Sequence, residues 1–141
     1  MAEHDVTVST TIAAVPDRVW DAMTAPAAVE QWMMGAHVES SWEQGAEIRW
    51  SGEFNGKPYT DTGKILEVDP GTRLVHTHAS SMSDGDPHVV SWTLDPAGDD
   101  ATTLTLVQHG AASDAEAEQF ETNWTSMLES LRDVAEAGVG R

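Results

Sequence analysis

The amino-acid sequence predicts an α+β fold in which a curved antiparallel sheet of about six to seven strands wraps around one long C-terminal helix. Residues 36–109 form short runs of alternating apolar and polar side chains separated by turn residues, a pattern typical of strands. Because strands joined by short turns must run antiparallel, these runs predict one antiparallel sheet. Residues 113–137 instead repeat apolar side chains every three or four positions, which predicts a helix with one wide apolar face.

The first 32 residues predict one strand followed by two short helices. Residues 5–12 alternate as strand residues do. Pro16 suits the first turn of a helix, and Asp17 beside it complements the positive end of the helix dipole. This helix is expected to end before Pro26, which begins a second short helix that ends near Trp32.

The middle of the chain predicts a hairpin and three further strands. Residues 47–54 alternate strictly and are followed by Asn55-Gly56, the strongest short hairpin signal, so residues 59–68 are expected to form the return strand. We expect a bulge in this return strand. After a turn at Asp69-Pro70-Gly71, the remaining segments are strands at residues 73–78, 88–94 and 102–108, with a polar loop at residues 80–86.

The last helix has a start signal as well as an apolar face. Ser113 is a suitable N-cap, and Glu116 three residues later completes a capping box. Because 141 residues is near the usual size of one domain and no linker-like stretch divides the chain, we expect residues 1–141 to form a single domain. The apolar face of the helix consists of Phe120, Trp124, Met127, Leu128, Leu131, Val134 and Ala135.

The composition excludes several classes of partner and site. The 141 residues include 24 acidic and 7 basic side chains, which gives a formal net charge of −17, and no cysteine. Such a charge repels nucleic acids and anionic membranes, and the lack of cysteine excludes disulfides and thiolate metal sites. An acidic surface of this kind suits a salt-rich cytosol, where ions screen the repulsion, and a GC-rich genome is an equally weighted alternative explanation.

The sequence also predicts a cytoplasmic location without membrane or nucleic-acid partners. Residues 1–8 lack the basic start and the apolar run of a signal peptide, and no apolar stretch approaches the roughly 20 residues needed to cross a bilayer. A homodimer is a further expectation, because Trp20 and Trp42 fall where they can remain exposed, and exposed aromatic side chains often mark contacts.

The inward side chains of the sheet and the long helix predict a pocket for a small apolar or aromatic molecule. Gly52 and Gly63 on inward faces are expected to make room where the sheet bends. A cavity lined by aromatic side chains with a few polar groups is typical of a ligand site. The alternative is that these aromatic rings pack against one another. The candidate pocket residues are Trp32, Met33, Trp50, Gly52, Phe54, Gly63, His76, His78, Trp92, Gln108, Trp124, Met127 and Leu128.

Two histidines are the residues best suited to chemistry. His76 and His78 lie two positions apart on one strand, so both project to the same face about 7 Å apart. With His88 as a third ligand they have the spacing of a metal site, but such a site would need a further histidine or carboxylate, and we expect no metal and no cofactor. The ordinary pKa of histidine, about 6.5, suits a general acid or base at neutral pH, and a pocket histidine could pair with Asp61 or Tyr59 in this role. The sequence does not fix the face of the strand on which Asp61 lies.

Six segments occur in an order that resembles one protein superfamily. They are residues 12–32, beginning Ile-Ala-Ala-Val-Pro-Asp-Arg-Val-Trp, then Gly-Lys-Ile-Leu-Glu-Val-Asp-Pro at 63–70, Arg-Leu-Val-His-Thr-His at 73–78, and residues 90–94, 102–106 and 124–131. Together they resemble the SRPBCC superfamily, also called START-like or Bet v 1-like, and its subgroup named for similarity to the activator of the Hsp90 ATPase. The resemblance covers residues 6–135.

The resemblance implies a helix-grip fold with a pocket between the sheet and the C-terminal helix. It does not imply one activity, since proteins with this fold include lipid carriers, hormone receptors and aromatic polyketide cyclases. Two positions depart from the family pattern: Gln108 stands where the family often carries His, and Asn123 stands where it often carries Gly.

Three functions are therefore compared. The first is binding of a small hydrophobic ligand in the pocket. The second is an enzyme of the polyketide cyclase or aromatase type, in which His76, His78 and Gln108 would act on a bound substrate. The third is a chaperone cofactor, implied only by the name of the subgroup. We expect no chaperone binding, because activators of that type resemble this chain only in part and carry an additional N-terminal domain.

Overall fold

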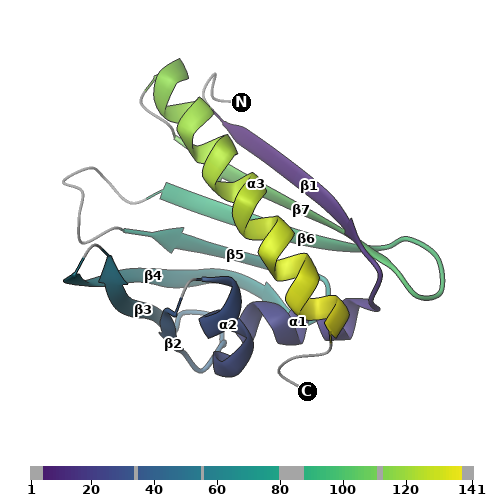
Figure 1. The fold of residues 1–141 in the computed structure, drawn as a ribbon. Coiled ribbons are helices and arrows are strands. Elements are labelled where there is room, and N and C mark those ends of the chain that lie inside the picture. Colours follow the sequence, from purple (N-terminus) through teal and green to yellow (C-terminus); the bar gives the residue numbers. More distant parts are fainter. Residues whose placement is uncertain (1–4, 34, 55, 80–87, 111–112, 138–141) are drawn as a thin grey trace.

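The structure, a computed structural model, describes residues 5–33, 35–54, 56–79, 88–110 and 113–137 (Figure 1). One strand, two short helices, six further strands and one long helix follow each other along the chain. They are β1 (Val6–Ile12), α1 (Pro16–Thr24), α2 (Pro26–Trp32), β2 (His37–Glu39), β3 (Glu47–Phe54), β4 (Lys57–Asp69), β5 (Arg73–His78), β6 (His88–Pro96), β7 (Thr102–His109) and α3 (Asp114–Ala137).

All seven described strands form one antiparallel sheet in the order β1-β7-β6-β5-β4-β3-β2. Figure 1 shows α3 crossing one face of this sheet, with α1 and α2 beside its C-terminal end. The predicted α+β helix-grip architecture is therefore confirmed. Among the described helices, none combines the length and the hydropathy that a membrane span requires.

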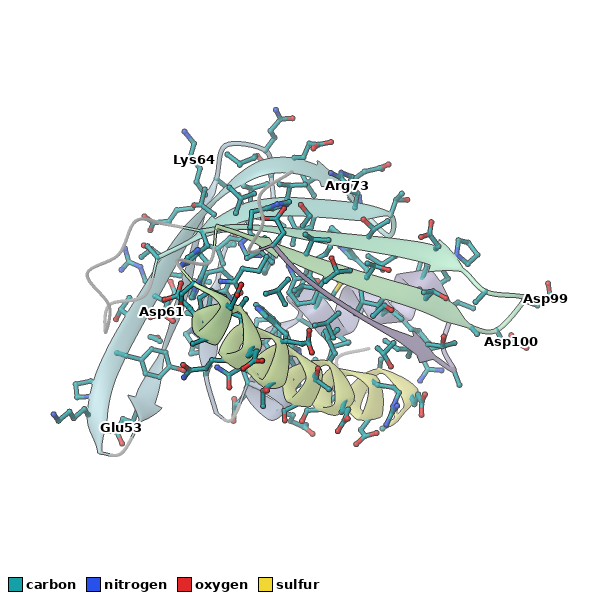
Figure 2. All side chains as sticks on the ribbon, turned by 90° about the horizontal axis from the view of Figure 1, so that it is seen from above. Glu53, Asp61, Lys64, Arg73, Asp99 and Asp100 are labelled. Carbon is teal, nitrogen blue, oxygen red and sulfur yellow. The ribbon has the colours of Figure 1, made fainter. Side chains whose placement is uncertain are left out.

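The β3–β4 hairpin has the register that the sequence predicts. Phe54 pairs with Lys57, which leaves two residues for the turn, and Gly56 has a φ of 79° that side chains of L-residues disfavour. The other turn residue, Asn55, lies outside the described residues, as does the polar loop predicted at residues 80–86. Figure 2 shows this hairpin, with Glu53 near its tip, curling out of the sheet toward the side on which α3 lies.

A bulge in β4 bends the sheet at its middle. The pairing of β4 with β5 shifts register between Ile65 and Glu67, as a strand with one extra residue does. Leu66 lies at the shift and is 41% exposed, whereas Ile65 before it is fully buried. The expected irregularity is confirmed, and its position leaves the first half of β4 in regular register with β3.

The core lies between the sheet and the C-terminal half of α3. Leu128, Leu131 and Ala135 of the helix are buried, and each large buried aliphatic side chain contributes roughly 1.5–3 kcal/mol relative to exposure. Phe120, Trp124 and Met127 in the first half of the helix are only partly buried. The helix therefore closes one end of the inner face tightly and the other end less so.

The expected exposure of two tryptophans is wrong. Trp20 and Trp42 are both partly buried and pack against the hydrophobic core. Trp42 takes a φ of 59°, an uncommon conformation for a residue with a side chain. The argument for a homodimer that rested on these two side chains therefore loses its basis.

Side chains hold both ends of α3. The hydroxyl oxygen of Ser113 accepts a hydrogen bond from the backbone N–H of Glu116 at 3.2 Å, which confirms the predicted N-cap. At the other end, Nη2 of Arg18 donates to the carbonyl oxygens of Ala135 at 2.9 Å and Glu136 at 3.2 Å. A cation at this end complements the negative end of the helix dipole, so Arg18 of α1 stabilises the last turn of α3.

Arg18→Ala should lower the free energy of unfolding by about 1–2 kcal/mol, because the last carbonyls of α3 lose both a charge-assisted donor and a favourable dipole interaction. Urea denaturation followed by far-UV circular dichroism measures the change. The matched control is Arg132→Ala, since Arg132 contacts only its chain neighbour Asp133, at 3.8 Å, among its described ionic partners. Equal effects of the two substitutions would contradict the assignment.

Candidate functional site

Three tryptophan rings contact one another on the inner face beneath α3. Trp92 of β6 contacts Trp124 of α3 with ring centroids 5.6 Å apart, and Trp32 of α2 at 6.2 Å. The indole N–H of Trp124 donates to the side-chain oxygen of Gln108, and that of Trp32 donates to the carbonyl of Ala22 at 2.7 Å. At this level the aromatic rings contact one another, and Trp124 contacts the sheet through Trp92 and Gln108.

His76 is locked as a neutral structural group. The indole N–H of Trp92 donates to Nε2 of His76 at 3.0 Å, and an indole N–H can only donate, so the ring proton must sit on Nδ1. That proton is donated to the carbonyl oxygen of Thr77 at 2.8 Å. Burial lowers the pKa of His76 to about 4. Both ring nitrogens are thus engaged, and His76 is unsuited to metal binding or proton transfer.

The two inward glycines are filled by neighbouring groups. At Gly63 a β-carbon would lie 2.1 Å from the carbonyl oxygen of Thr77 and 3.3 Å from the ring of Trp50. At Gly52 it would meet the ring of Tyr59 at 3.1–3.2 Å. The expectation that these glycines leave empty space at their own positions is therefore wrong, because their role is to admit close approach by a strand and by an aromatic ring.

A polar pair, His78 and Asp61, lies beside this packed interior. Nε2 of His78 donates to Oδ2 of Asp61 at 3.1 Å, and the side chains are 31% and 17% exposed. The pairs Ile65–His76 and Thr62–Ala79 place Gly63 opposite His78. Because Gly63 has no side chain, the His78 ring can lean across to Asp61, its diagonal neighbour on β4.

Two aromatic side chains, Trp50 and Tyr59, lie beside this pair on β3 and β4. The ring of Trp50 lies 5.4 Å from the ring of His78 and 5.4 Å from that of His76, centroid to centroid. Asp61 pairs with Trp50 across β3 and β4, and Tyr59 pairs with Gly52 one step nearer the hairpin tip. We call Trp50, Tyr59, Asp61 and His78 the His78 surface. In this surface the indole of Trp50 is buried, whereas the side chains of the other three residues are only partly buried.

The electrostatics of the His78 surface keep its phenol neutral. Burial, and then the nearby Asp61 carboxylate, raise the pKa of Tyr59 above its ordinary value. Since the Asp61 carboxylate only accepts, Nε2 of His78 carries the ring proton, and a neutral His78 presents Nδ1 as its basic nitrogen. The surface therefore offers one base, one carboxylate and one hydroxyl.

His88 does not complete a metal site with the other two histidines. It pairs with His78 across β5 and β6, but its Nδ1 donates to the carbonyl of His109 at 3.1 Å, and its ring packs on Phe120 at 5.2 Å. No group of three or more histidine and carboxylate side chains suited to a metal ion occurs among the residues that the structure describes.

The candidate pocket residues thus separate into three groups. Trp32, His76, Trp92, Gln108 and Leu128 are buried in the packed interior. His78 and Trp50 belong to the His78 surface, while Met33, Trp124 and Met127 are partly buried beside the core. The side chain of Phe54 lies outside the described residues.

The sequence analysis does not determine on which face of its strand Asp61 lies, and it does not include Tyr59 among the pocket residues. The signal was present in the hairpin: a two-residue turn at positions 55 and 56 pairs 54 with 57 and therefore 52 with 59 and 50 with 61. A bulge before Asp61 would turn its side chain to the other face, but the observed bulge falls after Ile65 and does not disturb this register.

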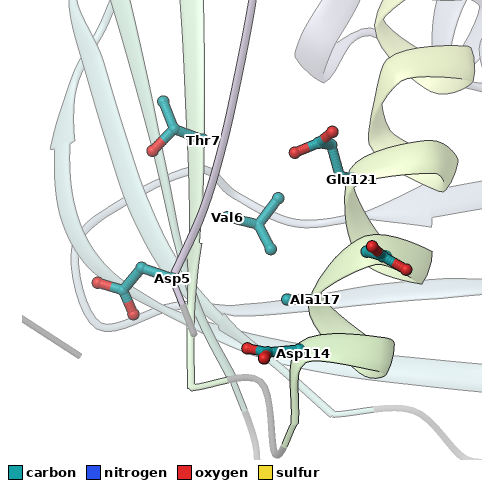
Figure 3. Close-up of a pocket in the computed structure, with 7 residues that line it drawn as sticks. Asp5, Val6, Thr7, Asp114, Ala117 and Glu121 are labelled. Atoms are coloured by element: carbon teal, nitrogen blue, oxygen red, sulfur yellow. The ribbon is translucent and has the colours of Figure 1, made fainter. Parts of the chain in front are cut away.

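A hollow lies at the β1 edge of the sheet, between the start of β1 and the start of α3 (Figure 3). Its volume is about 330 Å³ and its wall is mostly acidic. Asp5 in this wall is held by His109, whose Nδ1 lies 2.9 Å from Oδ2. The lining residues are Asp5, Val6, Thr7, Asp114, Ala117, Glu118 and Glu121.

Comparison with known proteins agrees with this architecture. The family model described as activator of Hsp90 ATPase homolog 1-like protein matches residues 13–136. The chain belongs to this family. A search of curated proteins found no match.

Solved structures of similar proteins cover the whole fold of this family member. ChR145 from Cytophaga hutchinsonii is 32% identical over 97% of both chains, with a TM-score of 0.81. DynU16, a protein of the dynemicin biosynthetic locus, is 28% identical with a TM-score of 0.82, and the match covers 97% of this chain but 49% of DynU16. CalU16 from Micromonospora echinospora, 21% identical with a TM-score of 0.76 over 93% of this chain and 75% of CalU16, shows the likeness of fold alone.

In this family member, Gly63→Ala should lower the free energy of unfolding by about 2–4 kcal/mol, because the new methyl group overlaps a backbone oxygen that cannot rotate away. Gly52→Ala is the matched control, with an expected loss of about 1 kcal/mol, since the ring of Tyr59 can shift. Chemical denaturation of both variants measures the difference. A Gly63→Ala variant as stable as the parent would show that the two strands are not in close contact.

The ring of His76 should stay neutral down to about pH 5 in the folded protein, which NMR of its ring nitrogens measures. Between the ordinary pKa of about 6.5 and the folded value of about 4, the unfolded chain binds a proton that the folded chain does not. His76 therefore contributes stability above this range that is lost as the pH falls, up to about 3 kcal/mol. His76→Gln should show a correspondingly shallower decline, and an equal slope for both proteins would refute the assignment.

Proposed function

We propose that this protein binds a small apolar or aromatic molecule against the His78 surface, between the β3–β4 hairpin and the partly buried first half of α3. One observation carries the proposal: a solvent-accessible polar pair, His78 and Asp61, is set beside a buried indole, that of Trp50. Aromatic walls with a few fixed polar groups are the usual character of a ligand site.

The packing beneath α3 argues for this side of the inner face. Trp124 contacts the ring of Trp92 and donates a hydrogen bond to Gln108, so a ligand at this place would have to displace these side chains. Trp50, Tyr59 and Asp61 face the same side from two paired strands, and Figure 2 shows Asp61 on the side of the sheet on which α3 lies. A ligand that rests on this surface needs no rearrangement of the core.

An acid–base enzyme is a second candidate, favoured by the hydrogen bond between His78 and Asp61. A carboxylate that holds Nε2–H orients the imidazole, stabilises its protonated form and leaves Nδ1 to accept a proton from a bound substrate. Such a pair suits aldol-type cyclisation or dehydration of a polyketide-like molecule. Similarity to DynU16, whose gene locus serves biosynthesis of dynemicin, supports this candidate by analogy.

The remaining expectations on partners stay predictions. A cytoplasmic location and the lack of nucleic-acid partners rest on the net charge of −17 and on the sequence pattern. A chaperone partner is suggested only by the family description, and none of the contacts described above supports it.

Titration with naphthylmethanol, a neutral aromatic probe, should quench or shift the tryptophan fluorescence in a saturable way. Tyr59→Ser and His78→Ala should each weaken binding about tenfold, because they remove an aromatic wall and a polar contact. His37→Ala is the control that should bind like the parent, since His37 lies on β2 and its side chain is 60% exposed.

Two results would count against ligand binding at this place. No saturable change with the parent protein would remove the proposal altogether. Unaltered affinity in Tyr59→Ser and His78→Ala would move the ligand to another part of the inner face. If a substrate is identified, His78→Gln and Asp61→Asn should reduce turnover far more than binding, and equal loss of both would refute the acid–base role.

A further inference from the structure

We propose that the edge of β1 binds an extended, basic segment of another protein by adding it to the sheet as a further strand. β7, β6 and β5 separate β1 from the β3–β4 hairpin, so this inference does not depend on the proposed function. It follows from the length and regularity of β1, from the side chains that the strand carries, and from the charge around it.

β1 forms an open edge of the sheet (Figure 1). Among the described strands it has one neighbour, β7, with which it pairs over its whole length without a shift in register. Every second residue of such a strand directs its backbone N–H and C=O groups away from the sheet, toward the place of an added strand. Just after β1, the backbone N–H of Ala13 donates to Oε2 of Glu136 at 2.9 Å, which marks the end of the open edge.

β1 lacks the features by which proteins usually block an edge strand. Residues 6–12 contain neither proline nor a charged side chain, and their pairing with β7 runs without a bulge. The other edge strand, β2, is only three residues long and has exposed ionisable side chains at both ends, His37 and Glu39. The outer side chains of β1 are instead small, neutral and exposed; they are those of Thr7, Ser9 and Thr11.

The charge of the protein determines which kind of strand can be added. A second copy of this chain would bring one net charge of −17 against another, and two such molecules repel each other. The side chains that line the hollow at the start of β1 have the same sign, since α3 contributes Asp114, Glu118 and Glu121 (Figure 3). Both the long-range field and the local charge therefore favour a basic partner over an acidic one or a second copy.

The hollow at the start of β1 also has a suitable form for a basic side chain. Val6 and Ala117 give it an apolar wall, while Glu118 and Glu121 bring carboxylates to it. Neither glutamate forms an ion pair with a side chain that the structure describes. Lysine and arginine lay an apolar stem on such a wall and keep their charge at the tip. A basic residue opposite Val6 on the added strand would project toward this hollow, because cross-strand neighbours lie about 5 Å apart on one face.

Two peptides slightly longer than β1 test the inference: one alternates lysine with threonine, and the other alternates glutamate with threonine. Isothermal titration calorimetry at about 0.15 M salt should show saturable binding of the lysine peptide, at least about tenfold tighter than that of the glutamate peptide. Amide hydrogen exchange followed by NMR locates the contact. Because only every second residue of β1 faces an added strand, the lysine peptide should slow the exchange of alternate amides of β1.

Ser9→Lys should weaken binding of the lysine peptide about fivefold, because it places a like charge on the edge strand itself. Ser9 is exposed on the outer face of the sheet, so the variant should keep the fold. Thr72→Lys is the matched control. It adds the same charge at an exposed position between β4 and β5, beyond β7 and β6, and should leave the affinity within about twofold of the parent.

Four results would overturn the inference. Absence of saturable binding would show that the edge takes no basic strand. Binding without slower exchange in β1 would place the peptide elsewhere on the acidic surface. Protection of alternate β1 amides from both sides in the free protein would show that the edge is already occupied, by a second copy if light scattering gives a dimer. Equal weakening by Ser9→Lys and Thr72→Lys would make the net charge, and not the strand edge, responsible.

Discussion

The buried hydrogen bond from the Trp92 indole to His76 determines how the inner face of this protein is organised. A buried imidazole without partners would carry a large desolvation penalty, but here one nitrogen accepts from Trp92 and the other donates to the Thr77 carbonyl. This fixes one tautomer and directs the Thr77 carbonyl toward the space that Gly63 leaves vacant. His78, the next inward residue, then faces Asp61 and not a side chain opposite.

Much of the fold could be predicted from the sequence because each element has a local signal. Alternation predicted β3 with its observed bounds, Pro16 and Pro26 marked the starts of α1 and α2, and Ser113 marked the start of α3. These signals act within a few residues and need no knowledge of tertiary contacts. Packing between distant segments has no such signal, which is why the exposure expected for Trp20 and Trp42 was wrong.

The candidate site could be predicted only in part, for the same reason. The inward faces of His76, His78, Trp50 and Trp92 follow from alternation, whereas the different roles of the two histidines depend on which nitrogen meets which donor. A glycine on an inward face signals close approach, but the sequence does not say whether a ligand, a ring or a backbone oxygen approaches. At Gly52 it is a ring and at Gly63 a backbone oxygen.

The pairing of β1 with β7 joins the two most distant parts of the sheet, since Val6 lies opposite Gln108. A ribosome releases the chain from its N-terminal end, so the first strand emerges long before the strand that receives it. Until then the apolar side chains of β1 lack the β7 strand beside which they are buried in the native state; they are those of Val6, Val8 and Ile12. Pairing of β1 must therefore wait until β7 has been synthesised, so the two ends of this topology assemble late relative to the local hairpins.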